Sequence, residues 1–140
     1  MNALLQKFFR SLDEKALSEL AGARSQRKLF GGTTCQLELV YLDPPFQIER
    51  VTLAPSIVPR HRHPSVDSVE VALWGDSEYS INRHRFHTRY DVPLKLRASP
   101  ISRTSWHGGI APAGGSFLSI QYWYRKPVPI LEDWEGERLA

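Results

Sequence analysis

Two of the five histidines, His61 and His63, lie one residue apart in the stretch RHRHPSVDSVEVALWGD. In a β-strand, side chains two residues apart leave the same face, about 6.5–7 Å apart along the backbone. Two imidazoles at this separation can bind one divalent metal ion, with Zn–N bonds of about 2.0–2.1 Å. Simple solvent exposure is the alternative for such a pair. We interpret the pair as half of a metal site.

The surroundings of this pair resemble the first motif of the cupin superfamily. They combine His-x-His, a turn that opens with Pro64, nearby acidic residues, an apolar strand and Gly75. A later stretch, SPISRTSWHGGIAPAGGSFLSIQYW, resembles the second cupin motif, with His107 in the metal-ligand position. The resemblance covers residues 57–123 and implies an RmlC-like jelly-roll barrel. It also implies a divalent transition metal (Fe, Mn, Ni or Zn), and the implied ligands are His61, His63 and His107.

A carboxylate often completes a cupin metal site, but its usual position is Ser68 in this chain. Glu70 shares a strand face with Ser68, so we expect Glu70 to point into the barrel and complete the site. Asp67 is the alternative carboxylate. The opposite register is also open, in which the barrel core is lined by Val69, Val71 and Leu73. In that case Glu70 points to solvent, and three histidines alone resemble the thiol dioxygenase branch of the cupins.

Two neighbours of the expected ligands are candidates for substrate binding. Trp106 precedes His107 and would wall the pocket for an apolar or planar substrate. Arg60 precedes His61 and would hold a substrate carboxylate at the mouth of the pocket. Strand alternation, however, points Arg60 away from the ligand face.

The leading hypothesis is a small metal-dependent cupin enzyme that acts on a small organic molecule. The ion would serve as a Lewis acid or as a dioxygen-binding centre, and the latter would make the protein a dioxygenase-like oxidoreductase. The first alternative is a non-catalytic cupin that binds or senses a small ligand. The second is a basic nucleic-acid-binding β domain built around NRHRFHTRY. A net charge of only +3 makes a nucleic-acid partner the weaker hypothesis, and we interpret that stretch as a charged loop or edge strand.

The N-terminal residues 2–22 show helical spacing of apolar side chains. Their apolar positions are Leu4, Leu5, Phe8, Phe9, Leu12, Ala16, Leu17 and Leu20. Ser11 and Glu14 have the form of a capping box, which predicts a break near Ser11 and a new helical start at Leu12. Gly22 is a natural helix end. We expect this segment to pack on the barrel.

From Thr33 onward, short β-rich runs alternate with turn residues, which is typical of a sandwich or barrel. The expected strands are TTCQLELVYL, FQIERVTL, SIVPRHRH, VEVALW, SEYSIN, VPLKLRA and GSFLSIQYWY. Gly75-Asp76 predicts a hairpin turn, and GGIAPAGG reads as a hairpin connection as well. We therefore predict an all-β double-stranded β-helix at residues 31–126. An N-terminal helical segment (1–30) and a C-terminal tail (127–140) would pack on it.

The 140 residues fit one domain, and the lone Cys35 has no partner for an internal disulfide. We interpret Cys35 as a free structural thiol, which suits a reducing compartment. No apolar run approaches the ~20 residues that span a bilayer, and the N-terminus lacks the features of a signal peptide. We expect a cytoplasmic protein without a membrane partner. The cupin resemblance implies a homodimer.

Overall fold

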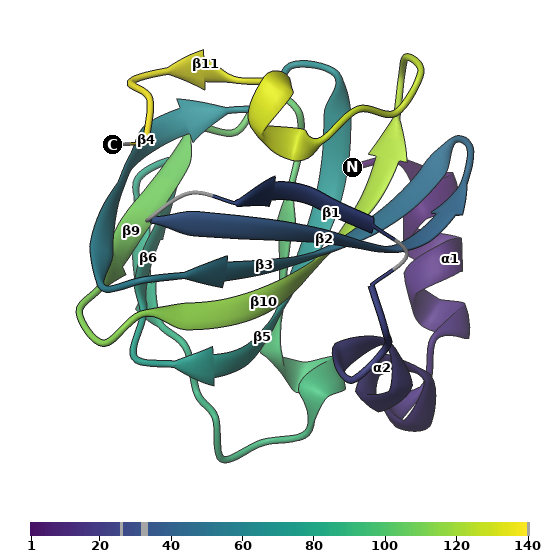
Figure 1. Ribbon diagram of the computed structural model, residues 1–140, viewed down its shortest axis with the longest axis horizontal. Helices are drawn as coiled ribbons and strands as arrows, with labels where there is room; N and C mark the ends of the chain where they lie inside the picture. Colours follow the sequence, from purple (N-terminus) through teal and green to yellow (C-terminus); the bar gives the residue numbers. More distant parts are fainter. Residues whose placement is uncertain (26, 32–33, 140) are drawn as a thin grey trace.

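Two antiparallel β-sheets face each other in the computed structural model, which describes residues 1–25, 27–31 and 34–139 (Figure 1). The six-stranded sheet has the order β1 (Arg27–Gly31), β2 (Cys35–Asp43), β3 (Phe46–Leu53), β10 (Gly115–Trp123), β5 (Val66–Gly75) and β8 (Ala98–Ile101). The five-stranded sheet has the order β11 (Glu135–Gly136), β4 (Ser56–Arg62), β9 (His107–Ala111), β6 (Glu78–Ile81) and β7 (His84–His87). The predicted all-β architecture is confirmed.

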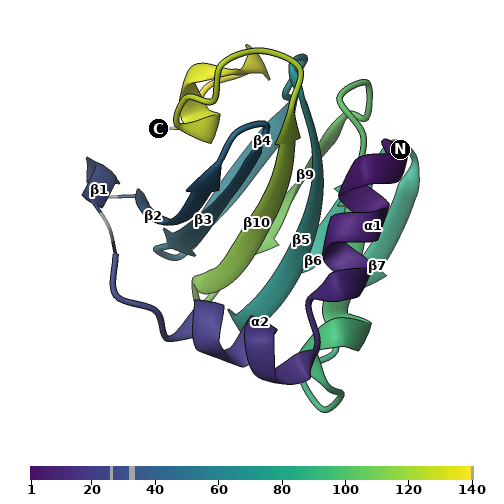
Figure 2. The same cartoon turned by 90° about the vertical axis from the view of Figure 1, so that its right-hand side faces the viewer.

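Two short helices, α1 (Ala3–Ser11) and α2 (Glu14–Ala21), cover the outer face of the six-stranded sheet (Figure 2). The break between them lies where the sequence predicts it, but the predicted capping box is wrong. Ser11 ends α1, and its hydroxyl donates to the carbonyl of Phe8 at 2.6 Å. Asp13 caps α2 instead, because its carboxylate accepts from the Ala16 amide at 2.8 Å. Neither helix is long and apolar enough to span a membrane in the described ranges.

The helices bury one face of β5 outside the barrel. Their apolar side chains form an outer core with the sheet, and its buried members are Leu5, Leu17, Val40, Ile48, Val69, Val71, Leu118 and Ile120. The opposite face of β5 turns Glu70 into the barrel, where it lines a pocket. The register in which Val69 and Val71 line the barrel interior is therefore wrong. The apolar stripe of β5 does face a core, but that core lies between the sheet and the helices.

The barrel interior combines an apolar cluster with a buried network of hydrogen-bonded polar side chains. The apolar members are Cys35, Leu37, Val51, Leu53, Val66, Trp123 and Ile130. In the polar network, the Gln121 amide donates to the Glu49 carboxylate at 2.7 Å, and the Gln47 amide donates to Gln121 at 2.9 Å. The same Glu49 oxygen accepts from the Ile130 amide at 3.1 Å. This network of hydrogen bonds anchors the start of the C-terminal tail to β3 and β10.

Both predicted hairpins are wrong, because each connection joins strands of different sheets. β5 pairs with β10 and β8, whereas β6 pairs with β9 and β7. Gly75 ends β5 with φ of +136°, and a Cβ there would lie 2.8 Å from the Gly114 carbonyl oxygen. A sharp corner between the sheets therefore needs glycine at this position. The residues 108–115 likewise pass from β9 in one sheet to β10 in the other.

Two further boundaries differ from the sequence-based prediction. The expected strand VPLKLRA is mostly a 3₁₀ turn, η1 (Leu94–Arg97), which precedes β8. β1 pairs with β2 and begins at Arg27, inside the segment 1–30 that was expected to be helical. The tail contains a second 3₁₀ turn, η2 (Ile130–Glu132), and then β11, which pairs with β4. The end of the chain therefore extends the five-stranded sheet.

Candidate metal centre

Three buried histidines converge inside the barrel. His61 lies near the end of β4 and pairs across the ladder with His107, the first residue of β9. His63 follows β4 directly. The three side chains are 4%, 7% and 3% exposed in chain order, and their potential ligand nitrogens lie within 4.8 Å of one another. The structure thus brings together the three residues that the sequence singled out.

Backbone carbonyl groups set the orientation of all three rings. Each Nδ1 lies within hydrogen-bond distance of a carbonyl oxygen: His61 to Pro59 at 2.7 Å, His63 to Asp133 at 2.6 Å and His107 to Ser105 at 3.1 Å. A carbonyl oxygen can only accept, so each neutral ring carries its proton on Nδ1 and its lone pair on Nε2. Such contacts fix the tautomer in the way that metal-binding histidines require.

The site holds the histidines in their neutral, metal-binding form. The pKa of His61 is lowered to about 2, mainly by burial and in smaller part by the neighbouring rings of His107 and His63. Burial is also the main cause that lowers the pKa of His63 to about 3 and of His107 to about 4. At neutral pH, the three rings therefore need no deprotonation before they can bind a cation.

One observation tests whether a metal ion suits these residues. The Nε2 atom of His107 is buried and has no hydrogen-bond partner among the described residues. A buried polar atom without a partner costs roughly 1–3 kcal/mol, so an orphaned lone pair needs an explanation. A divalent ion shared with His61 and His63 would satisfy it, and among the expected metals three imidazoles are a ligand set that suits Zn, Fe or Ni. The donor set fits the ion.

The C-terminal tail forms a wall of this site, which the sequence reasoning missed. Trp134 stacks on His61, with ring centroids 3.7 Å apart and ring planes 7° from parallel. The Asp133 carbonyl accepts from His63, and the Asp133 carboxylate accepts from the Ser65 amide at 2.9 Å. The sequence shows only an acidic tail that contains one tryptophan, and no local pattern connects that tryptophan to a histidine 73 residues earlier.

Glu70 shares the histidine pocket, in which about 500 Å³ of space, part of it open to solvent, lies between the lining residues. The Tyr79 hydroxyl of β6 donates to the Glu70 carboxylate at 3.0 Å. Burial raises the pKa of Glu70 to about 7, although the hydrogen bond from Tyr79 lowers it in part. Glu70 does not belong to the group of converging ligand atoms, which among the described residues contains only the histidines. It thus points inward as predicted, but it is held by Tyr79.

Asp67, the alternative carboxylate, is engaged elsewhere. One of its oxygens accepts from the Arg103 amide at 2.8 Å. The other accepts from the Asn2 amide at 3.0 Å and from the Tyr124 hydroxyl at 2.8 Å. Asp67 therefore fastens the start of α1 to the barrel, and it does not line the histidine pocket. A role for Asp67 as metal ligand is wrong for this structure.

Neither predicted substrate-binding residue lines the histidine pocket. Arg60 is exposed, as strand alternation indicated. Trp106 packs against the guanidinium of Arg62, which lies 5.0 Å from its ring centroid. Arg62 also forms an ion pair with Glu135 of the tail. Both predicted positions therefore contribute to the outside of the barrel, because their neighbours in the sequence already occupy the inward direction.

Cys35 and the basic stretch NRHRFHTRY also have defined places. Cys35 is a buried free thiol that lines the histidine pocket, and burial raises its pKa to about 12. It is therefore uncharged at neutral pH, as a structural thiol should be. The basic stretch includes β7, an edge strand of the five-stranded sheet, in which His84, Arg85 and His87 are exposed. This position agrees with a charged edge strand.

Comparison with known proteins identifies the fold. Neither a family model nor a curated protein sequence matches the chain. Among solved structures, KdgF from Halomonas sp. has a TM-score of 0.59 at 16% identity and covers 72% of this chain and 89% of its own. An RmlC-like cupin from Shewanella frigidimarina has a TM-score of 0.58 at 11% identity, with 71% and 86% covered.

Pac13, a nucleoside dehydratase for which Streptomyces structures are known, has a TM-score of 0.58 at 9% identity. It covers 81% of this chain and 86% of its own length. Identities this low establish the fold and leave the activity open. The predicted double-stranded β-helix of the cupin type is confirmed.

Proposed function

We propose that this chain, which has the cupin fold, is a metal-dependent enzyme that acts on a small organic molecule. The observation that carries the proposal is the convergence of three buried, neutral imidazoles, one of which has an orphaned Nε2 atom. His61, His63 and His107 would hold a divalent transition metal. The bound ion would supply Lewis-acid chemistry and leave coordination positions open to a substrate. Pac13 has the same fold and is a nucleoside dehydratase, so an active site can be built on this framework.

Glu70 and Tyr79 favour proton transfer as the chemistry. They line the same pocket as the histidines, and they come from opposite sheets of the barrel. A carboxyl group with a pKa of about 7 can accept or donate a proton near neutral pH. The Tyr79 hydroxyl holds the carboxylate in place through its 3.0 Å hydrogen bond. Glu70 would therefore move a proton on a substrate held near the histidines, while the tail residue Trp134 keeps His61 oriented.

A dioxygen-dependent reaction is the second candidate. It is favoured by the composition of the converging group, which contains three histidines and no carboxylate among the described residues. This ligand set resembles that of the thiol dioxygenases. Turnover that stops when oxygen is removed would favour this oxidoreductase over the proton-transfer enzyme. A Glu70→Gln variant separates the two in the same assay, because only proton transfer through Glu70 requires its titratable carboxyl group.

Elemental analysis of the protein purified without a histidine tag tests the metal site. We expect about one equivalent of iron, manganese, nickel or zinc per chain, lost in both His61→Ala and His107→Ala. His84→Ala is the matched control, because His84 is an exposed histidine of the edge strand β7. Wild-type protein without stoichiometric metal after growth in each of these metals would refute the proposal. Retention of metal in His107→Ala would also refute the three-histidine site.

The assembly and the location of the protein stay predictions. The expected homodimer is tested by sedimentation or light scattering of the full chain, in which a mass of twice 16.0 kDa is expected. The expected cytoplasmic location is tested by fractionation of cells that express the untagged chain.

A further inference from the structure

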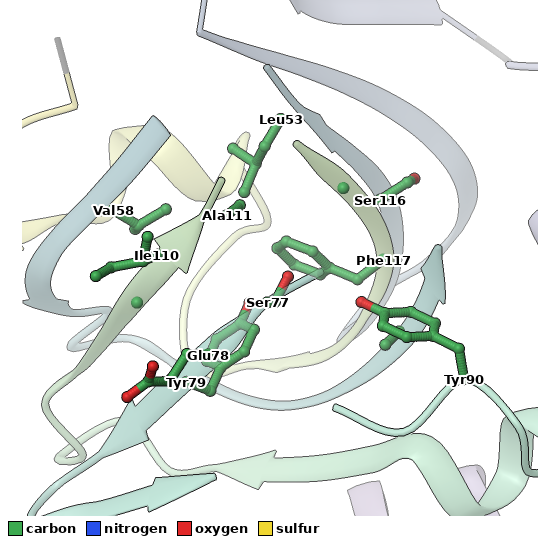
Figure 3. Close-up of a pocket in the computed structure, with 13 residues that line it drawn as sticks. Leu53, Val58, Ser77, Glu78, Tyr79, Tyr90, Ile110, Ala111, Ser116 and Phe117 are labelled. Carbon is green, nitrogen blue, oxygen red and sulfur yellow. The ribbon is translucent and has the colours of Figure 1, made fainter. Parts of the chain in front are cut away.

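A second cavity lies in the barrel beside the histidine pocket, and about 400 Å³ of space, part of it open to solvent, lies between its lining residues (Figure 3). The two cavities share four lining residues: Leu53, Val58, Tyr79 and Phe117. Figure 3 shows the Phe117 ring reaching into the second cavity between Leu53 and Tyr79. The same side chains thus form the partition between the cavities, and a ligand seated in one of them touches the residues that bound the other.

The strand β9 indicates how far the pair of cavities extends. His107 lines the histidine pocket, whereas Ala111, four residues further along the strand, lines the second cavity. At about 3.3 Å per residue, these positions lie about 13 Å apart along the barrel. The tail residues Leu131 and Trp134 bound the histidine pocket and do not line the second cavity. The second cavity therefore lies toward the end of the barrel that the tail leaves uncovered.

The second cavity is apolar where it meets the histidine pocket. Its partition is made of Leu53, Val58 and the rings of Phe117 and Tyr79. Two of the polar groups that line it already have partners: the Ser116 hydroxyl donates to the Val51 carbonyl at 2.9 Å, and the Tyr79 hydroxyl donates to Glu70. At the partition itself, a polar ligand group would therefore gain few hydrogen bonds, whereas an apolar group would lose none.

We propose that the second cavity is an apolar subsite for the substrate of the histidine centre. The substrate would be an amphiphilic small molecule, with a metal-binding polar head at the histidines and an alkyl or aryl tail beyond Phe117. This inference rests on the proposed function, because the head group needs a metal. The subsite selects the substrate by the length of its tail, since the tail must pass the partition residues and fill the second cavity near Ala111.

Binding of alkyl hydroxamates to the zinc-loaded protein tests the subsite. A hydroxamate binds the metal through its head, and its tail lengthens from acetohydroxamate through butyro- and hexano- to octanohydroxamate. Isothermal titration calorimetry should show the Kd falling about fourfold for each buried methylene until the cavity is full. The binding heat capacity should also become more negative along the series, because apolar surface is removed from water.

A pair of matched variants locates the effect. Ala111 is 3% exposed and lines the second cavity, whereas Ala113 is exposed in the turn two residues later. Ala111→Leu should remove the gain with chain length and leave acetohydroxamate binding unchanged, and Ala113→Leu should behave as the wild type. Ser77→Leu fills the same cavity from a partly exposed position, so it keeps the test valid if Ala111→Leu does not fold.

The outcomes distinguish this inference from the proposed function. Protein that binds zinc and acetohydroxamate, but shows no gain with chain length, refutes the subsite and leaves the metal centre intact. An equal gain in the wild type and in folded Ser77→Leu or Ala111→Leu also refutes it. Protein that does not retain zinc refutes the metal centre, and the subsite inference falls with it.

Discussion

Replacement of the buried Glu49 by glutamine should change how the stability of the fold depends on pH. Glu49 is fully buried, one of its carboxylate oxygens has no partner among the described residues, and its pKa is raised to about 7. Desolvation by burial is the largest cause, and the hydrogen bonds from Gln121 and Ile130 lower the pKa in part. Folding therefore favours the protonated carboxyl group.

The sign and size of the effect follow by linkage. The folded state binds the proton more tightly than the unfolded state, so this contribution is complete below pH 4.5 and is lost as the pH rises through about 7. At about 1.4 kcal/mol per pH unit, the full loss is about 3 kcal/mol, of which about 2.5 kcal/mol develops between pH 5 and pH 8. Glu49→Gln cannot titrate and should lack this loss.

Urea unfolding of both proteins at pH 5 and pH 8, with a chelator present, measures the difference. Relative to the wild type, Glu49→Gln should gain about 2–3 kcal/mol in its free energy of unfolding between the two pH values. Titration of the histidines affects both proteins alike and cancels in the comparison. Glu19→Gln, at an exposed helix position, controls for the loss of one negative charge. An equal stability difference between Glu49→Gln and wild type at both pH values would refute the reasoning.

Two further predictions concern the helices and the tail. Leu17 is 0% exposed between α2 and the sheet, so Leu17→Ala should lower the free energy of unfolding by about 2–5 kcal/mol in chemical unfolding. Leu4 is 54% exposed, so the control Leu4→Ala should change that free energy by less than about 0.5 kcal/mol. Trp134→Ala should weaken zinc binding by about tenfold or more in competition with a chelator, because the ring that stacks on His61 is lost. Trp74→Ala, at a position 51% exposed, is the control, and equal zinc affinity in both variants would contradict the role of the tail.

Much of the local structure could be predicted from periodicity. The apolar spacing of residues 2–22 predicts helices, and the alternation within β5 separates an apolar face from the face of Ser68 and Glu70. The sequence alone left open which face enters the barrel. That choice depended on α1 and α2, which supply a second apolar surface outside the sheet. Periodicity shows that one face is buried, but it does not show what buries it.

The turn residues predicted where the chain reverses direction, but they did not predict which strands pair with each other. Gly75 does mark the end of β5, yet the next strand belongs to the other sheet. A glycine with positive φ permits a hairpin and a sheet-to-sheet corner equally well. Which of the two forms depends on pairing with β10 and β9, strands that lie about forty or thirty residues further along the chain.

The sequence by itself indicated His61 and His63 as half of a possible metal site, because their spacing in a strand is a local property, and the resemblance to the second cupin motif added His107. Only the tertiary structure decided that His107 pairs with His61 across the ladder, that Tyr79 holds Glu70, and that the tail brings Trp134 onto the imidazole. The physical reason is range. Strand spacing is set by the backbone of neighbouring residues, whereas contacts between distant segments form only when the whole core packs in one register.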